Sequence, residues 1–259
     1  MRASAAWILV AVFAMVLSVV SPGVATAVAS VPQALGHAEG GPSTLINTNY
    51  SYNWAGYAAT SAAGSVTQVS GTWVQPTVTC PKPAASYLST WVGIDGYNNG
   101  DLVQTGTSAA CIGGTVSYNA WWEVLPAPET VISSITVHAG DTITASVTYS
   151  STTHKFTMSI ADGASSFSKT KKVSGTARDS VECIVERPSV GGSIASLAKF
   201  TSDKFSSCTA TIGGITGAIG TFANVYAIDM VNNHDTKIIG LTSALKSNTA
   251  FSVKWKGYS

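Results

Sequence analysis

Apolar and polar residues alternate along much of this chain with a period of two. Between positions 142 and 149, Ile143, Ala145 and Val147 alternate with threonine and serine, which places the two sets on opposite faces of a half-buried strand. Similar runs rich in Val, Ile, Thr, Tyr and Trp recur between clusters of Gly, Pro, Asn and Ser, as in all-β proteins. The predicted strands are 65–75, 87–94, 115–124, 134–137, 142–149, 155–160, 166–173, 180–186, 205–212, 225–230 and 250–255.

This succession of short strands predicts an all-β fold, an antiparallel β-sandwich in which about eleven to fourteen strands form two sheets. A helical spacing of apolar residues is found only at 192–200, around Ile194, Leu197 and Ala198. We expect one domain over residues 47–259, since a β-rich unit of roughly 210 residues can bury a sizeable core.

The first 29 residues have the pattern of a secretion signal. Arg2 is the only charged residue before Glu39, an apolar run follows at 5–20, and Ala25-Thr26-Ala27 supplies small residues for cleavage. A membrane anchor is the alternative, but the run is shorter than the roughly 20 residues of a span, and no positive cluster follows it. We predict a signal peptide at 1–29, a linker or short propeptide at 30–46, and a secreted, extracellular protein that is not attached to a membrane after cleavage.

Charge and composition narrow the range of partners. The chain has 14 basic and 13 acidic residues, so removal of Arg2 with the signal leaves 13 of each and a formal charge of zero. A neutral chain with scattered lysines argues against nucleic acid and anionic membranes as partners. Nothing in the strands demands a second subunit, so a monomer is expected.

Four cysteines, at positions 80, 111, 183 and 208, are expected to oxidise after export. Of the three possible connectivities, we favour Cys80–Cys111 with Cys183–Cys208, because each pair brackets one local stretch. Zinc ligation is the alternative, but no two cysteines have C-x-x-C spacing and no histidine lies nearby.

The chain lacks the familiar hydrolase motifs: a G-x-S-x-G elbow, H-E-x-x-H, a P-loop and an aspartic-protease loop. Its four histidines fall in segments that read as surface loops. Carboxylates and one carboxamide instead interrupt the apolar, strand-like runs, where burial is unfavourable without a hydrogen bond or a function. Each alone reads as a satisfied polar residue at a strand end, whereas together they favour a shared polar cleft. They are Asp95, Gln104, Glu123, Glu182, Glu186 and Asp229.

Several ordered motifs resemble those of the G1 glutamic peptidases, or eqolisins, a family of acid-active secreted endopeptidases. They extend over most of the chain expected to remain after cleavage, and their number and order make the resemblance specific. The matching segments are Asn53-Trp54-Ala55-Gly56-Tyr57, Trp91-Val92-Gly93-Ile94-Asp95-Gly96, Gln104-Thr105-Gly106, the Y-x-A-W-x-E-x-x-P segment from Tyr118 to Pro126, and Glu182-Cys183-Ile184-Val185-Glu186.

The resemblance implies two seven-stranded sheets in a lectin-like sandwich, a cleft on a concave face, a catalytic pair formed by Gln104 and Glu186, and no metal or cofactor. It also implies that Trp54, Trp91, Asp95 and Glu123 line or support the cleft. We expect Asp95 and Glu123 to hydrogen-bond each other or Gln104.

The chain departs from the family pattern at two places, with Cys183 where the family usually has Trp and Val124-Leu125 in place of a more aromatic pair. If Cys183 pairs with Cys208, the bridge would stiffen the strand that carries Glu186.

The residue types suit hydrolysis of polypeptide substrates in acid. A Glu186 carboxylate can take a proton from the attacking water and return it to the leaving amine, and an uncharged Gln104 amide can donate to the oxyanion at any pH. A non-catalytic, lectin-like carbohydrate-binding module is the alternative, since such sandwiches also present Trp, Asp and Asn on a concave face. A glycoside hydrolase using Glu123 and Glu186 is a third hypothesis and would need the two carboxyls about 5–9.5 Å apart.

Overall fold

The computed structural model describes residues 39–40, 47–80 and 85–258. The predicted signal peptide at 1–29 lies outside these residues, as does most of the 30–46 segment, in which only strand β1 (Glu39–Gly40) is described. Among the described residues, no helix is long and apolar enough to cross a membrane. One 3₁₀ turn, η1 (Ile219–Thr221), accompanies the strands.

One sheet, called here the site sheet, has seven principal strands. All neighbours are antiparallel except β19 and β2, which run parallel. In spatial order the strands are β8 (Thr115–Val124), β7 (Val103–Ile112), β6 (Ser86–Ile94), β13 (Ser180–Glu186), β3 (Trp54–Thr60), β19 (Asn224–Val231) and β2 (Asn47–Ser51). The central strand β13 is buried on both faces.

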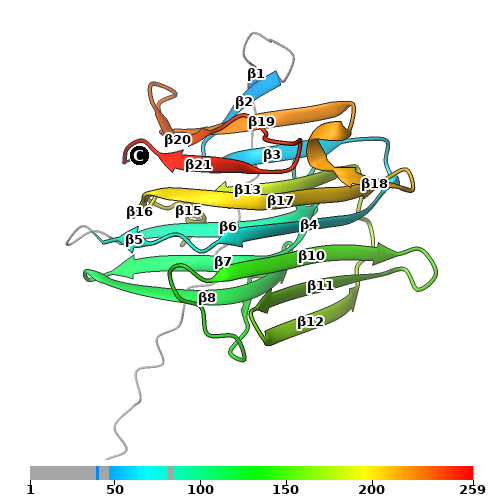
Figure 1. The fold of residues 1–259 in the computed structure, drawn as a ribbon, viewed down its shortest axis with the longest axis horizontal. Coiled ribbons are helices and arrows are strands. Elements are labelled where there is room, and N and C mark those ends of the chain that lie inside the picture. The colour runs from blue at the N-terminus through cyan, green and yellow to red at the C-terminus, as the bar shows by residue number, and fades with distance from the viewer. Residues whose placement is uncertain (1–38, 41–46, 81–84, 259) are drawn as a thin grey trace, which may run out of the picture.

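The second sheet, the back sheet, also has seven principal strands, and its β20 pairs with β19, which joins the two sheets along one side. In Figure 1 the strands of both sheets run across the page in nearly the same direction, the aligned arrangement of a β-sandwich. The order is β12 (Ser165–Lys172), β11 (Lys155–Asp162), β10 (Thr142–Ser150), β4 (Val66–Val74), β17 (Ser202–Ile212), β21 (Phe251–Trp255) and β20 (Ile238–Thr242).

Seven short strands complete the structure beside the two sheets. They are β1, β5 (Val78–Thr79), β9 (Thr130–Val131), β14 (Ser189–Val190), β15 (Ser193–Ile194), β16 (Lys199–Phe200) and β18 (Ile215–Ala218). The predicted antiparallel sandwich of two seven-stranded sheets is therefore confirmed.

Two groups of apolar side chains lie on the two faces of the site sheet. The main core includes Trp73, Val92, Phe156 and Phe205, all fully buried or nearly so. A smaller cluster, called here the tryptophan cluster, consists of Trp54, Ala58, Trp91, Leu102, Trp121, Ile184 and Ile228. Strand periodicity sends Ile184 to the face opposite Cys183 and Val185, which belong to the main core.

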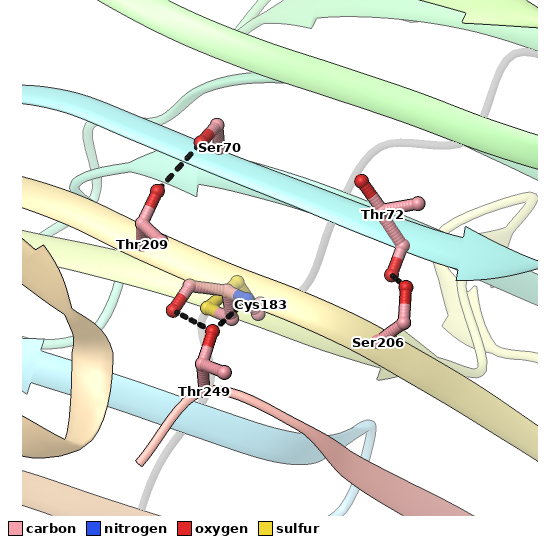
Figure 2. The surroundings of a disulfide bond; sticks show 7 residues. Ser70, Thr72, Cys183, Ser206, Thr209 and Thr249 are labelled. Atoms are coloured by element: carbon pink, nitrogen blue, oxygen red, sulfur yellow. Dashed lines mark hydrogen bonds between the residues drawn. A yellow bond between two sulfur atoms is a disulfide. The ribbon is translucent and has the colours of Figure 1, made fainter. Parts of the chain in front are cut away.

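Both predicted disulfides are present, Cys80–Cys111 and Cys183–Cys208. The second joins β13 of the site sheet to β17 of the back sheet. Figure 2 shows Thr249 beside this bridge, where its hydroxyl accepts from the Cys208 N–H at 2.9 Å and donates to the Cys208 carbonyl at 3.1 Å. The bridge therefore ties the strand of Glu186 to the opposite layer.

Two predictions of secondary structure are wrong. The segment 192–200 contains the two short strands β15 and β16 instead of a helix, and Leu197 and Ala198, in the connection between them, are buried. The segment 134–137 is irregular, although Ile135 and Val137 alternate into the main core. The alternation of apolar residues in this segment reflects their burial in the core, although the backbone does not pair with a neighbouring strand.

Candidate active site

Neighbouring strands of the site sheet bring the predicted polar residues onto one face. Gln104 on β7 pairs with Glu123 on β8 and with Gly93 on β6. Glu186 on β13 pairs with Ser89 on β6 and with Trp54 on β3. Because side chains two residues apart share a face, these positions lie on the same side of the sheet as the tryptophan cluster.

A glycine on β7 makes room for the tryptophan between the two polar positions. A Cβ at Gly106 would lie 2.2 Å from the Thr90 carbonyl oxygen and 2.5 Å from the Cβ of Trp91. Any side chain at this position would therefore displace β6 or the indole of Trp91. The Q-T-G motif thus combines the amide of Gln104 with the space that Trp91 needs.

A pocket opens between the polar side chains. It is small and partly open to solvent, and it is lined by Ser89, Gln104, Trp121, Glu123, Glu129, Glu186 and Pro188. The structure therefore brings together three residues that the sequence predicted, Gln104, Glu123 and Glu186. Trp91 and Trp54 flank Glu186 and pack edge to face, with ring centroids 5.1 Å apart.

The Glu186 carboxyl is held by two donors from different strands. The indole N–H of Trp91 donates to Oε2 at 2.7 Å, and the side-chain amide of Asn53 donates to Oε1 at 3.2 Å. Glu186 is nearly fully buried. Hydrogen bonds donated to both oxygens favour the charged carboxylate, which burial alone would disfavour.

The amide of Gln104 is oriented by Glu123, because its Nε2 donates to Oε2 of that residue. Glu123 is 3% exposed. Burial raises the pKa of Glu123 to about 8, and the negative charge of Glu186 adds to this, while the hydrogen bond from Gln104 opposes it. Glu123 is therefore a neutral carboxylic acid throughout the acidic range.

Asp95 is not in this pocket, so the expectation that it hydrogen-bonds Glu123 or Gln104 is wrong. Its carboxylate accepts from the main-chain N–H groups of Arg178 at 2.9 Å and Asp179 at 3.0 Å. Asp95 follows the last residue of β6 with a φ of 72°, which turns its side chain toward the segment that leads into β13. Its position supports the site through that segment, at a distance from the reacting groups.

Two further carboxyls of the predicted set are also outside the pocket. Glu182 lies on the same face of β13 as Glu186 but is fully enclosed, with the Ser180 hydroxyl as its neighbour two residues before it on the same strand. Burial raises the pKa of Glu182 well above its ordinary value, and the charges of Asp95 and Asp179 reinforce the shift. Asp229 accepts from the Thr242 N–H at 2.7 Å, between β19 and β20.

Sequence reasoning missed the role of Asn53, although this residue opens the N-W-A-G-Y motif. Asn53 lies in the turn between β2 and β3, where Ser51 donates to its Oδ1 at 3.0 Å. The Arg187 main-chain N–H donates to the Asn53 carbonyl at 3.0 Å. The Arg187 side chain is fully buried, and its guanidinium donates to the Tyr52 carbonyl and to Asn233 Oδ1. These bonds fix Asn53 relative to Glu186.

The other missed residue is Glu129, which belongs to no strand and no motif. It lies directly before β9, which folds back on β8 so that Thr130 pairs with Trp122. Burial and the charge of Glu186 raise the pKa of Glu129 to about 7. A position set by a reversal of the chain has no periodic signal in the sequence.

Comparison with known proteins gives consistent matches. The model of the Peptidase A4 family matches residues 52–255. Aspergillopepsin-2 of Aspergillus niger is 30% identical over 194 residues, which cover 66% of this chain and 68% of that protein.

Solved structures agree with these sequence matches. The structure of scytalido-glutamic peptidase with a transition state analog inhibitor has a TM-score of 0.68 at 22% identity, and covers 79% of this chain and 98% of that one. Aspergilloglutamic peptidase from Aspergillus niger gives 0.58 at 26% identity, over 66% of this chain and 99% of that one.

Proposed function

The chain belongs to the Peptidase A4 family of glutamic peptidases, which hydrolyse peptide bonds, and on this premise we propose that Gln104 and Glu186 form its catalytic pair. The observation that carries the proposal is the arrangement of Glu186, whose two oxygens accept from Trp91 and Asn53 in the pocket that also contains Gln104. A carboxylate stabilised by donors and a neutral amide are a base and an oxyanion donor that both persist in acid.

In the proposed reaction, Glu186 takes a proton from a water molecule as the water oxygen attacks the carbonyl carbon of the substrate. The carbonyl oxygen becomes an oxyanion, and the Gln104 amide donates to it. An amide nitrogen carries two hydrogens, so the Gln104 amide can donate to the oxyanion while Glu123 holds its orientation. Glu186 then gives its proton to the amine nitrogen, the C–N bond breaks, and a carboxylic acid and an amine leave.

The remaining residues hold these two groups in place. Glu123 accepts from Gln104 and so fixes the direction of its amide. Trp91 donates to Glu186, and Trp54 supports the Trp91 ring by edge-to-face packing. Asp95 fixes the segment ahead of β13 through its bonds to Arg178 and Asp179. A site built from these side chains needs no metal or cofactor.

The same proposal extends to the substrates, the organisation of the chain and the location of the protein. We propose polypeptides as substrates, a signal peptide at 1–29, a linker or short propeptide at 30–46, a catalytic domain at 47–259, and a monomeric protein secreted to the extracellular space without membrane attachment. The two disulfides support an oxidising compartment.

The test is cleavage of acid-denatured haemoglobin at about pH 3–4, where a general base of this kind still holds part of its charge. The parent is compared with Glu186→Gln and Gln104→Ala, after near-ultraviolet circular dichroism has shown that each variant is folded. Activity in the parent and its loss in both variants supports the pair. Undiminished activity of folded Glu186→Gln excludes it, and an inactive but folded parent favours a carbohydrate-binding module.

A further inference from the structure

The outer face of the back sheet, on the far side of the main core from the candidate active site, contains an open hollow of about 350 Å³. It crosses β10, β11 and β12, and its side chains are small: Thr144, Ser146, Ser159, Ala161, Ser166 and Ser168. Ala161 pairs with Thr144 on one side and Ser166 on the other, and its methyl group leaves the space open. The hollow has the size of a small-ligand site, and the proposed reaction does not use it.

Hydroxyl groups continue across this face beyond the hollow. Two cross-strand rows on β10, β11 and β12 consist of hydroxyl residues alone: Ser146-Ser159-Ser168 and Thr148-Thr157-Thr170. Within these rows the hydroxyls of β11 and β12 bond each other, at 3.1 Å between the serines and 2.9 Å between the threonines. A hydroxyl has one donor and two acceptor positions, so each pair keeps hydrogen-bonding capacity for a ligand that is itself rich in hydroxyls.

The same face carries positive charge and no negative charge. Its outward positions include four exposed lysines: Lys155, Lys172, Lys204 and Lys254. The acidic residues within the seven principal strands of the back sheet are Asp162 and Asp203. Both occupy positions that alternate inward, in step with the core residues Ile160 and Phe205. A chain with equal numbers of acidic and basic residues after signal removal therefore presents one purely basic face.

Two of these lysines are placed unfavourably for the protein alone. Lys155 and Lys172 lie directly opposite each other in the ladder of β11 and β12, where like charges destabilise a sheet. Within the described residues neither forms a salt bridge, and the ion pair found there joins His138 to Asp141. An anion between the two lysines would remove their repulsion. Their placement indicates an anionic ligand independently of the hollow.

We propose that this face binds a linear acidic polysaccharide, whose sugar hydroxyls bond the hollow and the hydroxyl rows and whose anionic groups contact Lys155 and Lys172. The two lysines lie four residues from Ser159 and Ser168 on the same strands, about 13 Å away, so a polymer is needed to contact both parts. Because the face is opposite the cleft, the bound protein keeps its candidate active site open to substrate.

The composition of the face selects this occupant over other macromolecules. The outward positions of β10, β11 and β12 hold Ser, Thr, Lys and Ala and no aromatic residue. Nucleic-acid bases stack on aromatic side chains, and protein interfaces are enriched in them. Hydroxyls beside uncompensated lysines instead complement a chain of sugars that carries carboxylate groups.

The experiment measures the affinity of the purified parent for polygalacturonate by isothermal titration at pH 6 and low salt, beside neutral dextran and single-stranded DNA. We expect polygalacturonate to bind about tenfold tighter than either comparison polymer, the equivalent of one or two net hydrogen bonds. Lys155→Gln/Lys172→Gln should weaken this binding about tenfold through the loss of two charged donors. Ala161→Leu fills the hollow without changing the charge and should weaken it severalfold.

Lys237→Gln/Lys246→Gln is the matched control. It removes the same charge at exposed positions beside β20, at the opposite edge of the back sheet from β12, and should bind as the parent does. A parent that does not bind polygalacturonate overturns the proposal, as does unchanged affinity in either folded test variant. Equal binding of DNA also overturns it, by showing that charge alone is recognised. Haemoglobin cleavage should be unchanged in Lys155→Gln/Lys172→Gln, which separates this result from the test of the catalytic pair.

Discussion

Trp91 donates its indole N–H to Glu186 at 2.7 Å from the neighbouring strand of the same sheet. Trp91→Phe removes this donor and keeps an aromatic ring against Trp54. Loss of the bond disfavours the carboxylate and so raises the pKa of Glu186, which means that activity at low pH falls first. We expect the acidic limb of the kcat/KM profile to move upward by about one pH unit.

Trp54→Phe is the control for that experiment. The Trp54 indole nitrogen has no hydrogen-bond partner, so its removal changes packing without removing a donor from Glu186. The acidic limb of Trp54→Phe should stay in place even if the rate changes. If the acidic limb of the kcat/KM profile lies at the same pH in both variants, the hydrogen bond from Trp91 does not control the ionisation of Glu186.

Glu123 should be replaceable by a neutral group of the same shape. Its pKa of about 8 makes it a neutral acid in the working range, so Glu123→Gln should keep activity at pH 4 within several-fold. Glu123→Ala leaves Gln104 without its acceptor and should lose about tenfold or more, as expected when a buried donor is left unpaired. Steady-state rates of the two variants at pH 4 decide this, and a severe loss in Glu123→Gln contradicts it.

Glu182 should make the protein less stable as the pH rises. Burial makes the pKa of the Glu182 carboxyl higher in the folded state than in the unfolded state, where it is about 4.3, and the hydrogen bond with Ser180 opposes this shift without cancelling it. The folded state therefore holds the extra proton. The stability from this group is fully present below pH 4.3 and is lost as the pH rises toward the folded-state pKa.

Urea unfolding of Glu182→Gln at several pH values from 4 to 7 measures this effect. The parent should lose up to about 1.4 kcal/mol more per pH unit than the variant, which corresponds to one proton. Parallel curves would show that Glu182 is not the group responsible. Buried Asp203, whose pKa is raised to about 7, adds a decline common to both proteins.

The Cys183–Cys208 bridge should affect both stability and catalysis. Its ends are 25 residues apart, and the double serine variant should lose about 3–4 kcal/mol in urea unfolding through the restored freedom of the unfolded chain. The corresponding variant of Cys80–Cys111, with a separation of 31, should lose a similar amount. Cys183 lies three residues from Glu186 on β13, whereas Cys111 lies seven residues from Gln104 on β7. Removal of the Cys183–Cys208 bridge should therefore lower kcat of the folded enzyme more than removal of the Cys80–Cys111 bridge.

The sequence predicted strands well where large apolar residues continue through the strand, and less well elsewhere. The predicted bounds of β8 and β13 agree with the structure, since both strands alternate through Val, Ile, Tyr or Trp and are bounded by turn-forming residues. Strand β7 was not among the predicted runs, because its centre, 105–108, holds threonine, glycine and serine. These small residues leave space for Trp91, and the reason for them becomes visible only in the paired sheet.

The part of the site that lies on regular strands could be predicted from motifs and from the period-two alternation. They identified Gln104, Glu123 and Glu186, which the structure brings into one pocket. They misplaced Asp95, because the backbone turns at that residue and ends the alternation. Glu129 was missed because a loop reversal, with no periodicity of its own, carries it to the pocket.

The enclosed position of β13 has a consequence for a peptidase that works among copies of itself. A peptidase can cut a segment only after that segment has separated from its neighbours and become extended. Strand β13 pairs on both sides, is buried on both faces and is bridged to the opposite sheet through Cys183, its central residue. Release of such a strand requires nearly complete unfolding, so the segment that performs the cleavage should be among the last to suffer self-digestion.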